Sequence, residues 1–350
     1  MLNRNSRIMA NQAKDIAVFT NGEIIGDGIV KLPFITALRI AMRSDKEFSQ
    51  DRLVWFCSDK SVYNNIMHEL VEDYIDEIIL LPSRKMSFSD YLYPTKADDR
   101  KFKLLIDTQM SPPRTLWLKR KFKYEDFISP SCNYLFSDKK PSLNSSANEK
   151  SSKLIDMLMT LGSLAMGRKL TAEPVTLKNP KWQEKARQML APNNKYVGFV
   201  PGAGQLHKRW HVDNYINLAR FVQEKGFVPV IFTGPAESDI NILFKENLEK
   251  VVIPFENADI EKDSDAFSPC FTIALAQYLN AVVANDGGGG NLVFAADKVP
   301  AIGIYRSGSV IRKYAHSREN FHGFCPENHG GNTINDIPLP AVKEKLAEIL

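Results

Sequence analysis

The stretch that decides the fold is KYVGFVPGAGQLHKRW, at residues 195–210. It opens with apolar, β-prone residues at 196–200, breaks at PGAG in 201–204, and reaches the basic pair Lys208-Arg209 before an amphipathic segment. A glycine-rich turn between a strand and a helix presents bare backbone N–H groups and a helix N-terminus, which both favour phosphate. The pattern predicts a phosphate-binding turn, with Lys208 as a matching point charge.

A second stretch, AVVANDGGGGNLVFAADKVPAIGIY at residues 281–305, repeats this logic. An apolar run is followed by Asp286, four glycines, a short helix of small residues expected at 291–296, and another apolar run. Two glycine-rich turns from strand to helix in one half of the chain predict that this half binds a nucleotide diphosphate.

Composition sets the limits of the interpretation. The 350 residues are 44% hydrophobic and 25% charged, which is typical of a globular protein with two domains. No apolar run reaches the roughly 18–20 residues of a membrane span, and residues 1–14 lack the apolar core of a signal peptide. The four cysteines have no metal-ligand spacing, and the net charge of +4 is too weak to indicate a nucleic-acid partner. We therefore expect a cytoplasmic protein.

Both halves alternate between strands and helices. In the first half, strands are expected at 15–20, 53–57, 77–81 and 103–106, with a helix from Pro33 to Met42 whose first turn holds the proline. In the second half the alternation is clearer, and three prolines in 171–192 mark the junction. The chain is predicted to form two doubly wound, Rossmann-like α/β domains, at 1–175 and 176–350, that face each other across a cleft. The last helix is expected to pack back on the N-terminal domain.

At this point the residues resemble a known family. The ordered motifs are similar to those of the ADP-heptose:lipopolysaccharide heptosyltransferases of glycosyltransferase family 9. The resemblance implies a GT-B architecture, with the acceptor on the N-terminal domain, the sugar nucleotide on the C-terminal domain, and inverting, metal-independent transfer without a cofactor. The motifs are Gly26-Asp27 with Pro33 and Leu38-Arg39, Asp107-Thr108-Gln109 with Arg114, Leu161-Gly162, Pro201-Gly202-Ala203 with Lys208-Arg209-Trp210, and Asp286-Gly287-Gly288.

Asp27 is the candidate catalytic base. A hydroxyl that attacks an anomeric carbon must lose its proton, and a nearby carboxylate can accept it. Asp27 follows the first expected strand, at the rim where open α/β sheets place ligands. The alternative is an Asp that only caps a helix or turn; Glu23 is a spare carboxylate nearby.

The donor site is expected around both glycine-rich turns. Lys208 should contact the diphosphate and stabilise the charge of the leaving group, although a solvated surface lysine is the plain alternative. Asp286 should bind sugar hydroxyls or hold its loop, and Glu237 should accept hydrogen bonds from ribose, unless it is only an exposed residue at a helix start. The expected donor residues are Gly202, Ala203, Gly204, Lys208, Glu237, Asp286, Gly287, Gly288, Gly289 and Asn291.

The second turn departs from the family pattern. Relatives carry Ser or Thr after the Asp, then Gly, then a His three positions later. This chain has Gly287, Gly288 and then Asn291 at the His position. Asn291 can donate a hydrogen bond to a phosphate or sugar oxygen, but it cannot carry the charge of a protonated imidazole.

A basic run with interleaved aromatic residues follows at 114–124. Arg114, Lys119 and Arg120 are the candidate acceptor-binding residues, which could meet the anionic groups of a lipopolysaccharide core or the surface of the inner membrane. The alternative is an amphipathic helix with one solvated basic face. The histidines share no ligand spacing, so no metal is expected.

The sequence thus predicts an inverting glycosyltransferase that moves heptose or a related sugar from an ADP-sugar to a lipopolysaccharide-type acceptor. The expected partners are the nucleotide-sugar donor, the glycan acceptor and, peripherally, the cytoplasmic face of the inner membrane. Two alternatives stay open: a sugar-nucleotide epimerase or hydrolase on the same fold, and a non-catalytic module that binds nucleotide or glycan.

Overall fold

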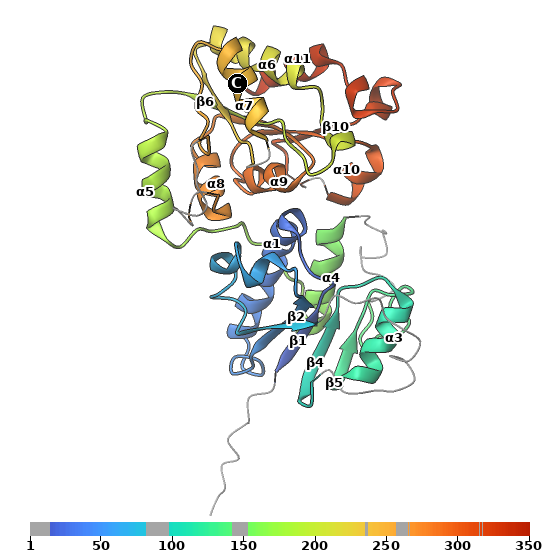
Figure 1. The fold of residues 1–350 in the computed structure, drawn as a ribbon. Helices are drawn as coiled ribbons and strands as arrows, with labels where there is room; N and C mark the ends of the chain where they lie inside the picture. The colour runs from blue at the N-terminus through green and yellow to red at the C-terminus, as the bar shows by residue number, and fades with distance from the viewer. Residues whose placement is uncertain are drawn as a thin grey trace, which may run out of the picture.

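The residues that the structure describes form two domains, each built on a five-stranded parallel sheet from one half of the chain, and the two domains are stacked one above the other in Figure 1. This matches the two-domain α/β fold that the alternation of strands and helices predicts. The computed structural model describes residues 15–81, 98–141, 153–234, 237–256, 265, 267–314, 316 and 318–350.

The N-terminal sheet has the strand order β3-β2-β1-β4-β5. Its apolar residues alternate between two faces: α1 and α4 cover one face, and α3 covers the other. Its elements are β1 (Ile16–Phe19), α1 (Ile25–Arg43), β2 (Leu53–Ser58), η1 (Val62–Asn64), η2 (His68–Leu70), β3 (Glu77–Leu81), β4 (Lys101–Asp107), α3 (Pro112–Lys121), β5 (Lys123–Ile128) and α4 (Leu154–Met166).

The C-terminal sheet has the strand order β10-β9-β8-β6-β7. One face packs against α6, α7 and α11, and the other packs against α8 and α9. Its elements are α5 (Pro180–Met189), β6 (Tyr196–Val200), η4 (Leu206–Lys208), α6 (Val212–Glu224), β7 (Val228–Ile231), α7 (Ser238–Asn247), α8 (Pro269–Ala276), β8 (Ala281–Asn285), α9 (Gly288–Phe294), β9 (Ala301–Ile304), α10 (Gly308–Tyr314), β10 (Phe321–Phe324), η6 (Pro326–His329), η7 (Ile334–Asp336) and α11 (Leu339–Ile349).

Each sheet reverses its strand order at one point. In the N-terminal sheet, β1 is flanked by β2 and β4; in the C-terminal sheet, β6 is flanked by β7 and β8. Chains that leave such a pair of strands turn in opposite directions and open a crevice at their carboxyl ends, which is where α/β sheets bind ligands. The segments after β1, β4, β6 and β8 are therefore placed to form a site.

The two domains share a continuous apolar core. A single buried cluster contains residues of α1 and α4 from the first half together with residues of α8 and α9 from the second. At its edge α1 contacts α9, as Figure 1 shows, and a Cβ added to Gly288 would lie 3.2 Å from that of Ile25. The Trp182 indole on α5 also donates to the Glu69 carboxylate at 2.7 Å and stacks on Phe271.

The first helix begins earlier than predicted. Instead of starting at Pro33, α1 starts at Ile25, so that the proline lies inside the helix and Asp27 lies in its first turn. An interior proline removes one backbone hydrogen bond and costs about 3 kcal/mol. The buried face that α1 presents from Ile29 onward to the core outweighs this cost.

The last helix packs differently from the expectation. Val342 and Leu346 of α11 are fully buried among residues of the C-terminal sheet, including Ile302 and Ile304, so α11 belongs to that domain's core rather than packing back on the N-terminal domain. Its apolar positions recur at helical spacing, which indicates burial but does not identify the face that buries them. The boundary between residues 175 and 176 stays a prediction.

Candidate functional site

Asp27 lies at the N-terminus of α1, where the chain returns from β1 at the reversal point of the N-terminal sheet. The carboxylate is partly exposed, and it makes no hydrogen bond or ion pair within the part of the chain that the structure describes. Ile24 caps the helix without a side-chain hydrogen bond, so the free N–H groups of the first turn face this rim. The position combines an available carboxylate with the positive end of a helix dipole.

Glu23, the carboxylate that precedes α1, is buried and bonded to neighbouring side chains. It is 1% exposed, and its carboxylate forms an ion pair with Lys31 of α1 at 2.9 Å. Three further groups donate to it: the Thr20 hydroxyl, the Ser61 hydroxyl and, at 3.3 Å, the indole N–H of Trp55. Such a saturated buried cluster fixes the loop that leads into α1, and it excludes Glu23 as a base because substrate cannot reach it.

The PGAG turn after β6 is closed by Glu237. A Cβ on Gly202 would lie 2.1 Å from the carboxylate of Glu237, so only glycine leaves room for this side chain. The carboxylate accepts from the backbone N–H of Gly234 at 2.9 Å and pairs with Arg209 at 3.1 Å, and Arg209 also donates to the Ala203 carbonyl at 2.9 Å. Glu237 is 9% exposed, which corrects the alternative of an exposed residue at a helix start.

A cluster of charges gathers where β6, β8 and β9 end. Burial raises the pKa of the Asp286 carboxyl above its ordinary value, Lys208 and Arg306 lower it, and Asp27 of the other domain raises it. Lys208, Arg306 and Asp27 therefore each lie within electrostatic reach of the Asp286 carboxylate. The structure thus brings together Asp27, Lys208 and Asp286, which the sequence nominates separately, and it adds Arg306, which the sequence analysis missed.

The glycine run starts α9 rather than preceding it. The helix begins at Gly288, three residues before the predicted start at Asn291. A Cβ on Gly290 would lie 2.2 Å from the carbonyl oxygen of Asn285, so this turn of helix can approach the end of β8 only without a side chain. The run is therefore a closely packed helix start.

Asn291 lies inside the seam between the domains. It is 8% exposed, and its side-chain amide donates to the carbonyl of Gly287 at 2.8 Å. The same amide nitrogen would lie 3.2 Å from a Cβ added to Gly26, one residue before Asp27. The residue at this position therefore holds the loop that contains Asp286 and limits how closely α9 approaches α1.

Asn285, at the end of β8, is a second residue that the sequence analysis missed. It is fully buried; its amide donates to the Pro201 carbonyl at 2.6 Å, and its oxygen accepts from the Tyr215 hydroxyl at 2.9 Å and the Trp210 backbone N–H at 3.3 Å. These bonds tie the two glycine-rich turns to each other. The signal available in the sequence was an uncharged polar residue that ends an otherwise apolar strand, directly before Asp286.

Asp107 ends β4 at the carboxyl edge of the N-terminal sheet. It accepts from Thr115 at 2.7 Å, Ser129 at 2.9 Å and the backbone N–H of Gln109 at 2.8 Å. Burial raises the pKa of this carboxyl from 3.8 to about 6, against these hydrogen bonds and the charge of Arg114, which lower it. Arg114 is therefore near the end of β4, where an acceptor on the N-terminal domain would approach.

The other two candidate acceptor residues are placed differently on α3. Lys119 donates to the carbonyl of Phe136 at 3.0 Å and lies over the ring of Phe127, so it supports the fold locally. Arg120 is exposed in the last turn of the helix. The structure places Arg114 at the rim and separates it by more than a helical turn from Lys119 and Arg120.

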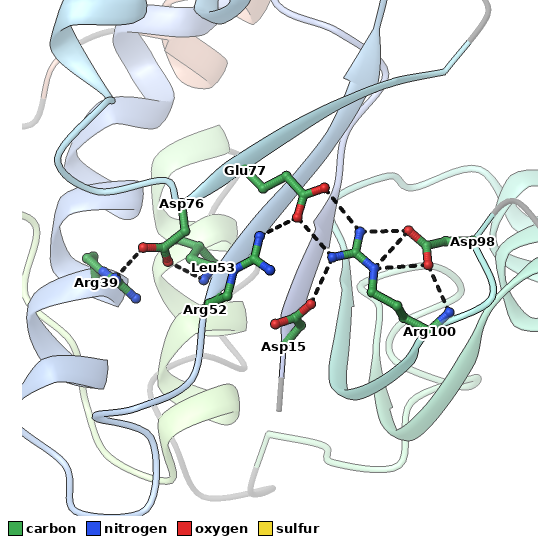
Figure 2. Close-up of polar contacts among 8 residues, drawn as sticks. All are labelled: Asp15, Arg39, Arg52, Leu53, Asp76, Glu77, Asp98 and Arg100. Atoms are coloured by element: carbon green, nitrogen blue, oxygen red, sulfur yellow. Dashed lines mark hydrogen bonds and ion pairs between the residues drawn. The ribbon is translucent and has the colours of Figure 1, made fainter. Parts of the chain in front are cut away.

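At the opposite edge of the N-terminal sheet, where the strands begin, charged side chains have a structural role, and they provide a comparison for Asp27. Figure 2 shows Arg100 between Asp15, Glu77 and Asp98, with ion pairs of 3.0, 2.9 and 2.7 Å. Arg39, part of the motif around α1, belongs to the same edge through its ion pair of 2.7 Å with Asp76. At this edge cations and carboxylates are paired, unlike Asp27 at the carboxyl edge.

No group of three or more His, Cys, Asp or Glu side chains is arranged to hold a metal ion among the residues that the structure describes. Over the same residues, no helix has the length and apolar character needed to cross a membrane. The arrangement instead joins an available carboxylate on one domain to cations and backbone N–H groups on the other. It can accept a proton on one side and stabilise a departing anion on the other.

Comparison with known proteins bears on the family and the fold of the chain. The family model described as glycosyltransferase family 9 (heptosyltransferase) matches residues 146–322. The comparison with curated protein sequences finds no significant match. The GT-B heptosyltransferases among the solved structures share the two-domain architecture.

Three solved structures extend over nearly the whole chain. A glycosyl transferase family 9 protein from Veillonella parvula is 15% identical, with 96% of this chain and 97% of that chain covered and a TM-score of 0.67. Escherichia coli heptosyltransferase WaaC, with ADP-2-deoxy-2-fluoro heptose, is 14% identical at 96% and 100% coverage, with a TM-score of 0.64. E. coli ADP-heptose lipopolysaccharide heptosyltransferase II is 14% identical at 96% and 98% coverage, with a TM-score of 0.59. At these identities the likeness establishes the fold.

Proposed function

The chain belongs to glycosyltransferase family 9, and on that premise we propose that it is an inverting transferase that moves heptose, or a related sugar, from an ADP-sugar to a lipopolysaccharide core acceptor. The observation that carries the proposal is the charge cluster across the domain seam. Asp27 of the N-terminal domain and Lys208 of the C-terminal domain both lie close enough to Asp286 to shift its pKa, Asp27 upward and Lys208 downward. A free carboxylate facing a diphosphate-binding rim is what a single displacement at an anomeric carbon requires.

In the proposed reaction, Asp27 accepts the proton of an acceptor hydroxyl while the hydroxyl oxygen forms a bond to the anomeric carbon. The bond from that carbon to the diphosphate breaks, and the nucleotide departs with the electron pair. Because attack and departure occur on opposite faces of the sugar, the anomeric configuration inverts. The absence of a competing hydrogen bond to Asp27 among the described residues supports its role, because its lone pairs are available to the acceptor.

The C-terminal rim is proposed to hold the donor. Lys208 neutralises charge on the diphosphate, and backbone N–H groups of the turns at 202–204 and 287–289 donate to its oxygens. Glu237 is proposed to accept from the ribose hydroxyls, for which its carboxylate must share or exchange its present bonds with Arg209 and Gly234. Asp286 is proposed to bind hydroxyls of the sugar, since a carboxylate repels phosphate.

The acceptor is proposed to lie on the N-terminal rim. Arg114, near the end of β4, is proposed to meet an anionic group of the glycan. Arg120, exposed at the end of α3, could contact anionic core groups or lipid head groups at the cytoplasmic face of the inner membrane. Lys119, which is bound to a backbone carbonyl, is proposed to contribute mainly through the shape of this surface.

The testing experiment is a calorimetric titration of the protein with ADP, GDP and UDP, in buffer without added metal. We expect preferential binding of ADP, weakened by at least about tenfold in Lys208→Ala because a charge-assisted contact is lost. A preference for UDP or GDP would refute the ADP-sugar donor, and no binding of any of the three would leave a non-catalytic module as the better explanation.

Product analysis with ADP-heptose then separates the chemistries. A transferase releases ADP only in proportion to glycosylated acceptor. A hydrolase releases ADP and free sugar without an acceptor, and an epimerase changes the sugar nucleotide itself. Either of the last two results would contradict the proposed function.

A further inference from the structure

Arg306 stands directly beside the Asp286 loop, at the carboxyl edge of the C-terminal sheet. It comes two residues after β9, and β9 pairs in parallel with β8 so that Asn285 lies opposite Ile304. The backbone N–H of Asp286 continues this ladder by donating to the Ile304 carbonyl at 2.9 Å. The segments that follow β8 and β9 therefore start side by side. Arg306 lies at the start of the segment that follows β9.

The guanidinium of Arg306 is available. The residue is exposed, and it forms no hydrogen bond and no ion pair with any residue that the structure describes. Two other arginines of the same domain are used by the fold: Arg209 binds Glu237 and a backbone carbonyl, and Arg318 donates to the carbonyls of Phe294, Ala296 and Val299. A surface arginine without a partner is ordinary, but this one lies at the ligand rim.

The charge balance around Asp286 indicates what the rim is suited to bind. Lys208 and Arg306 both act on this one carboxylate, from the turns after β6 and β9 on either side of it. Between them, the glycine run supplies backbone N–H groups but no cationic side chain. Two cations that share one partly buried carboxylate leave positive charge for an anion with more than one negative group.

We propose that Arg306 binds the diphosphate of the donor nucleotide opposite Lys208, so that the leaving group is held by two cations from two different strands. The proposal rests on the proposed function, and it adds a ligand that neither glycine-rich turn supplies. Arginine suits this task because its planar fork donates two parallel hydrogen bonds to phosphate oxygens. Since the charge on the leaving group grows as the glycosidic bond breaks, Arg306 should act on the rate of transfer as well as on binding.

The test compares ADP and AMP as calorimetric ligands for four proteins: the wild type, Arg306→Ala, Arg306→Lys and Lys313→Ala. Lys313 is an exposed cation on the neighbouring α10, so its removal changes the net charge equally. We expect Arg306→Ala to weaken ADP by about 10- to 100-fold and AMP by less than about threefold, as for loss of a charge-assisted contact to the second phosphate. Arg306→Lys should recover part of the affinity, and Lys313→Ala should change it by less than about twofold.

The outcomes separate this inference from the function on which it rests. If the wild type binds ADP, Lys208→Ala weakens it, and Arg306→Ala changes it by less than about twofold, the role of Arg306 is wrong while the donor site stands. An equal loss in Lys313→Ala would also overturn it, because the effect would then come from net charge. No binding of ADP, GDP or UDP to the wild type would overturn both. Arg306 is exposed, and equal melting temperatures for the four proteins would verify that folding is unchanged.

Discussion

The two rims that face each other across the domain seam handle their charges in opposite ways. On the N-terminal rim, Glu23 is buried and bonded on both carboxylate oxygens, and Asp27 alone stays available. On the C-terminal rim, the cations Lys208 and Arg306 have no bonded partner among the described residues, although they lie near Asp286. The difference teaches that a group which must abstract a proton needs a rigid support, whereas a rim that receives a charged ligand needs unused charge.

The supporting cluster is itself organised around a single helix end. Thr20 follows β1, Trp55 belongs to β2, Ser61 precedes η1, and Lys31 is on α1, yet all four converge on Glu23. The N-terminus of α1 has no side-chain cap, so this cluster is what holds the helix start. The following predictions test the contrast between the two rims, from the largest expected effect to the smallest.

Replacing Asp27 by Asn should reduce the rate of sugar transfer by about 100- to 10,000-fold, because the isosteric amide cannot accept the proton. The affinity for ADP should change by less than about twofold, since the diphosphate is assigned to the other rim. The measurement is acceptor glycosylation with saturating donor, alongside calorimetry with ADP. As a control, Asp213→Asn removes an exposed carboxylate from the first turn of α6. Full activity in Asp27→Asn would refute the assignment of the base.

Breaking the buried pair should destabilise the fold rather than the donor site. Glu23→Ala or Lys31→Met alone should lower the free energy of unfolding by about 3–5 kcal/mol, because each leaves a buried charge without its partner. The combined Glu23→Ala, Lys31→Met variant should lose clearly less than the sum of the single changes. Urea denaturation of the four proteins measures this coupling, and strictly additive losses would contradict it.

The buried carboxyl of Asp107 should make stability depend on pH in the direction opposite to the usual carboxylate. Because burial raises its folded pKa from 3.8 to about 6, the folded state favours the protonated form. Its contribution is therefore fully present below the unfolded pKa and is lost as pH rises through about 6, by about 3 kcal/mol in total. Denaturation curves of the wild type and Asp107→Asn between about pH 3.5 and pH 7 should differ by this amount, and a pH-independent difference would refute it.

The smallest expected effect concerns the PGAG turn. Gly202→Ala should displace the Glu237 carboxylate, which lies 2.1 Å from the added Cβ, and break its pairing with Arg209. ADP affinity should fall by about 3- to 10-fold, because the Glu237 carboxylate would no longer be in position to accept hydrogen bonds from the ribose hydroxyls. Gly204→Ala is the matched control, since a Cβ there meets nothing within 4 Å. Equal affinities for the two variants would show that Glu237 has no part in donor binding.

Local sequence patterns predicted many of the strands and helices of this structure. The apolar runs before both glycine-rich turns predicted β6 and β8, and the strands 53–57, 77–81 and 103–106 appear within two residues of their expected ends. The start of α1 was wrong because Pro33 was interpreted as a helix beginning, a local preference that burial of Ile29 and its neighbours overrides. The start of α9 was wrong because four glycines were expected to form only a turn.

The sequence by itself determined the two parallel α/β domains, the two turns suited to phosphate, and Asp27 as an acid after the first strand, because strands, turns and helices follow from spacings of a few residues. Only the tertiary structure decided which charged side chains are paired within the fold and which stay available to a ligand. The sequence places Glu23 and Asp27 only four residues apart and does not show which of them is buried. Trp55 and Ser61, more than 30 residues away along the chain, bind Glu23 in the folded protein. Likewise, pairing of β8 with β9 brings Arg306 beside Asp286, and such long-range register is not encoded in any local motif.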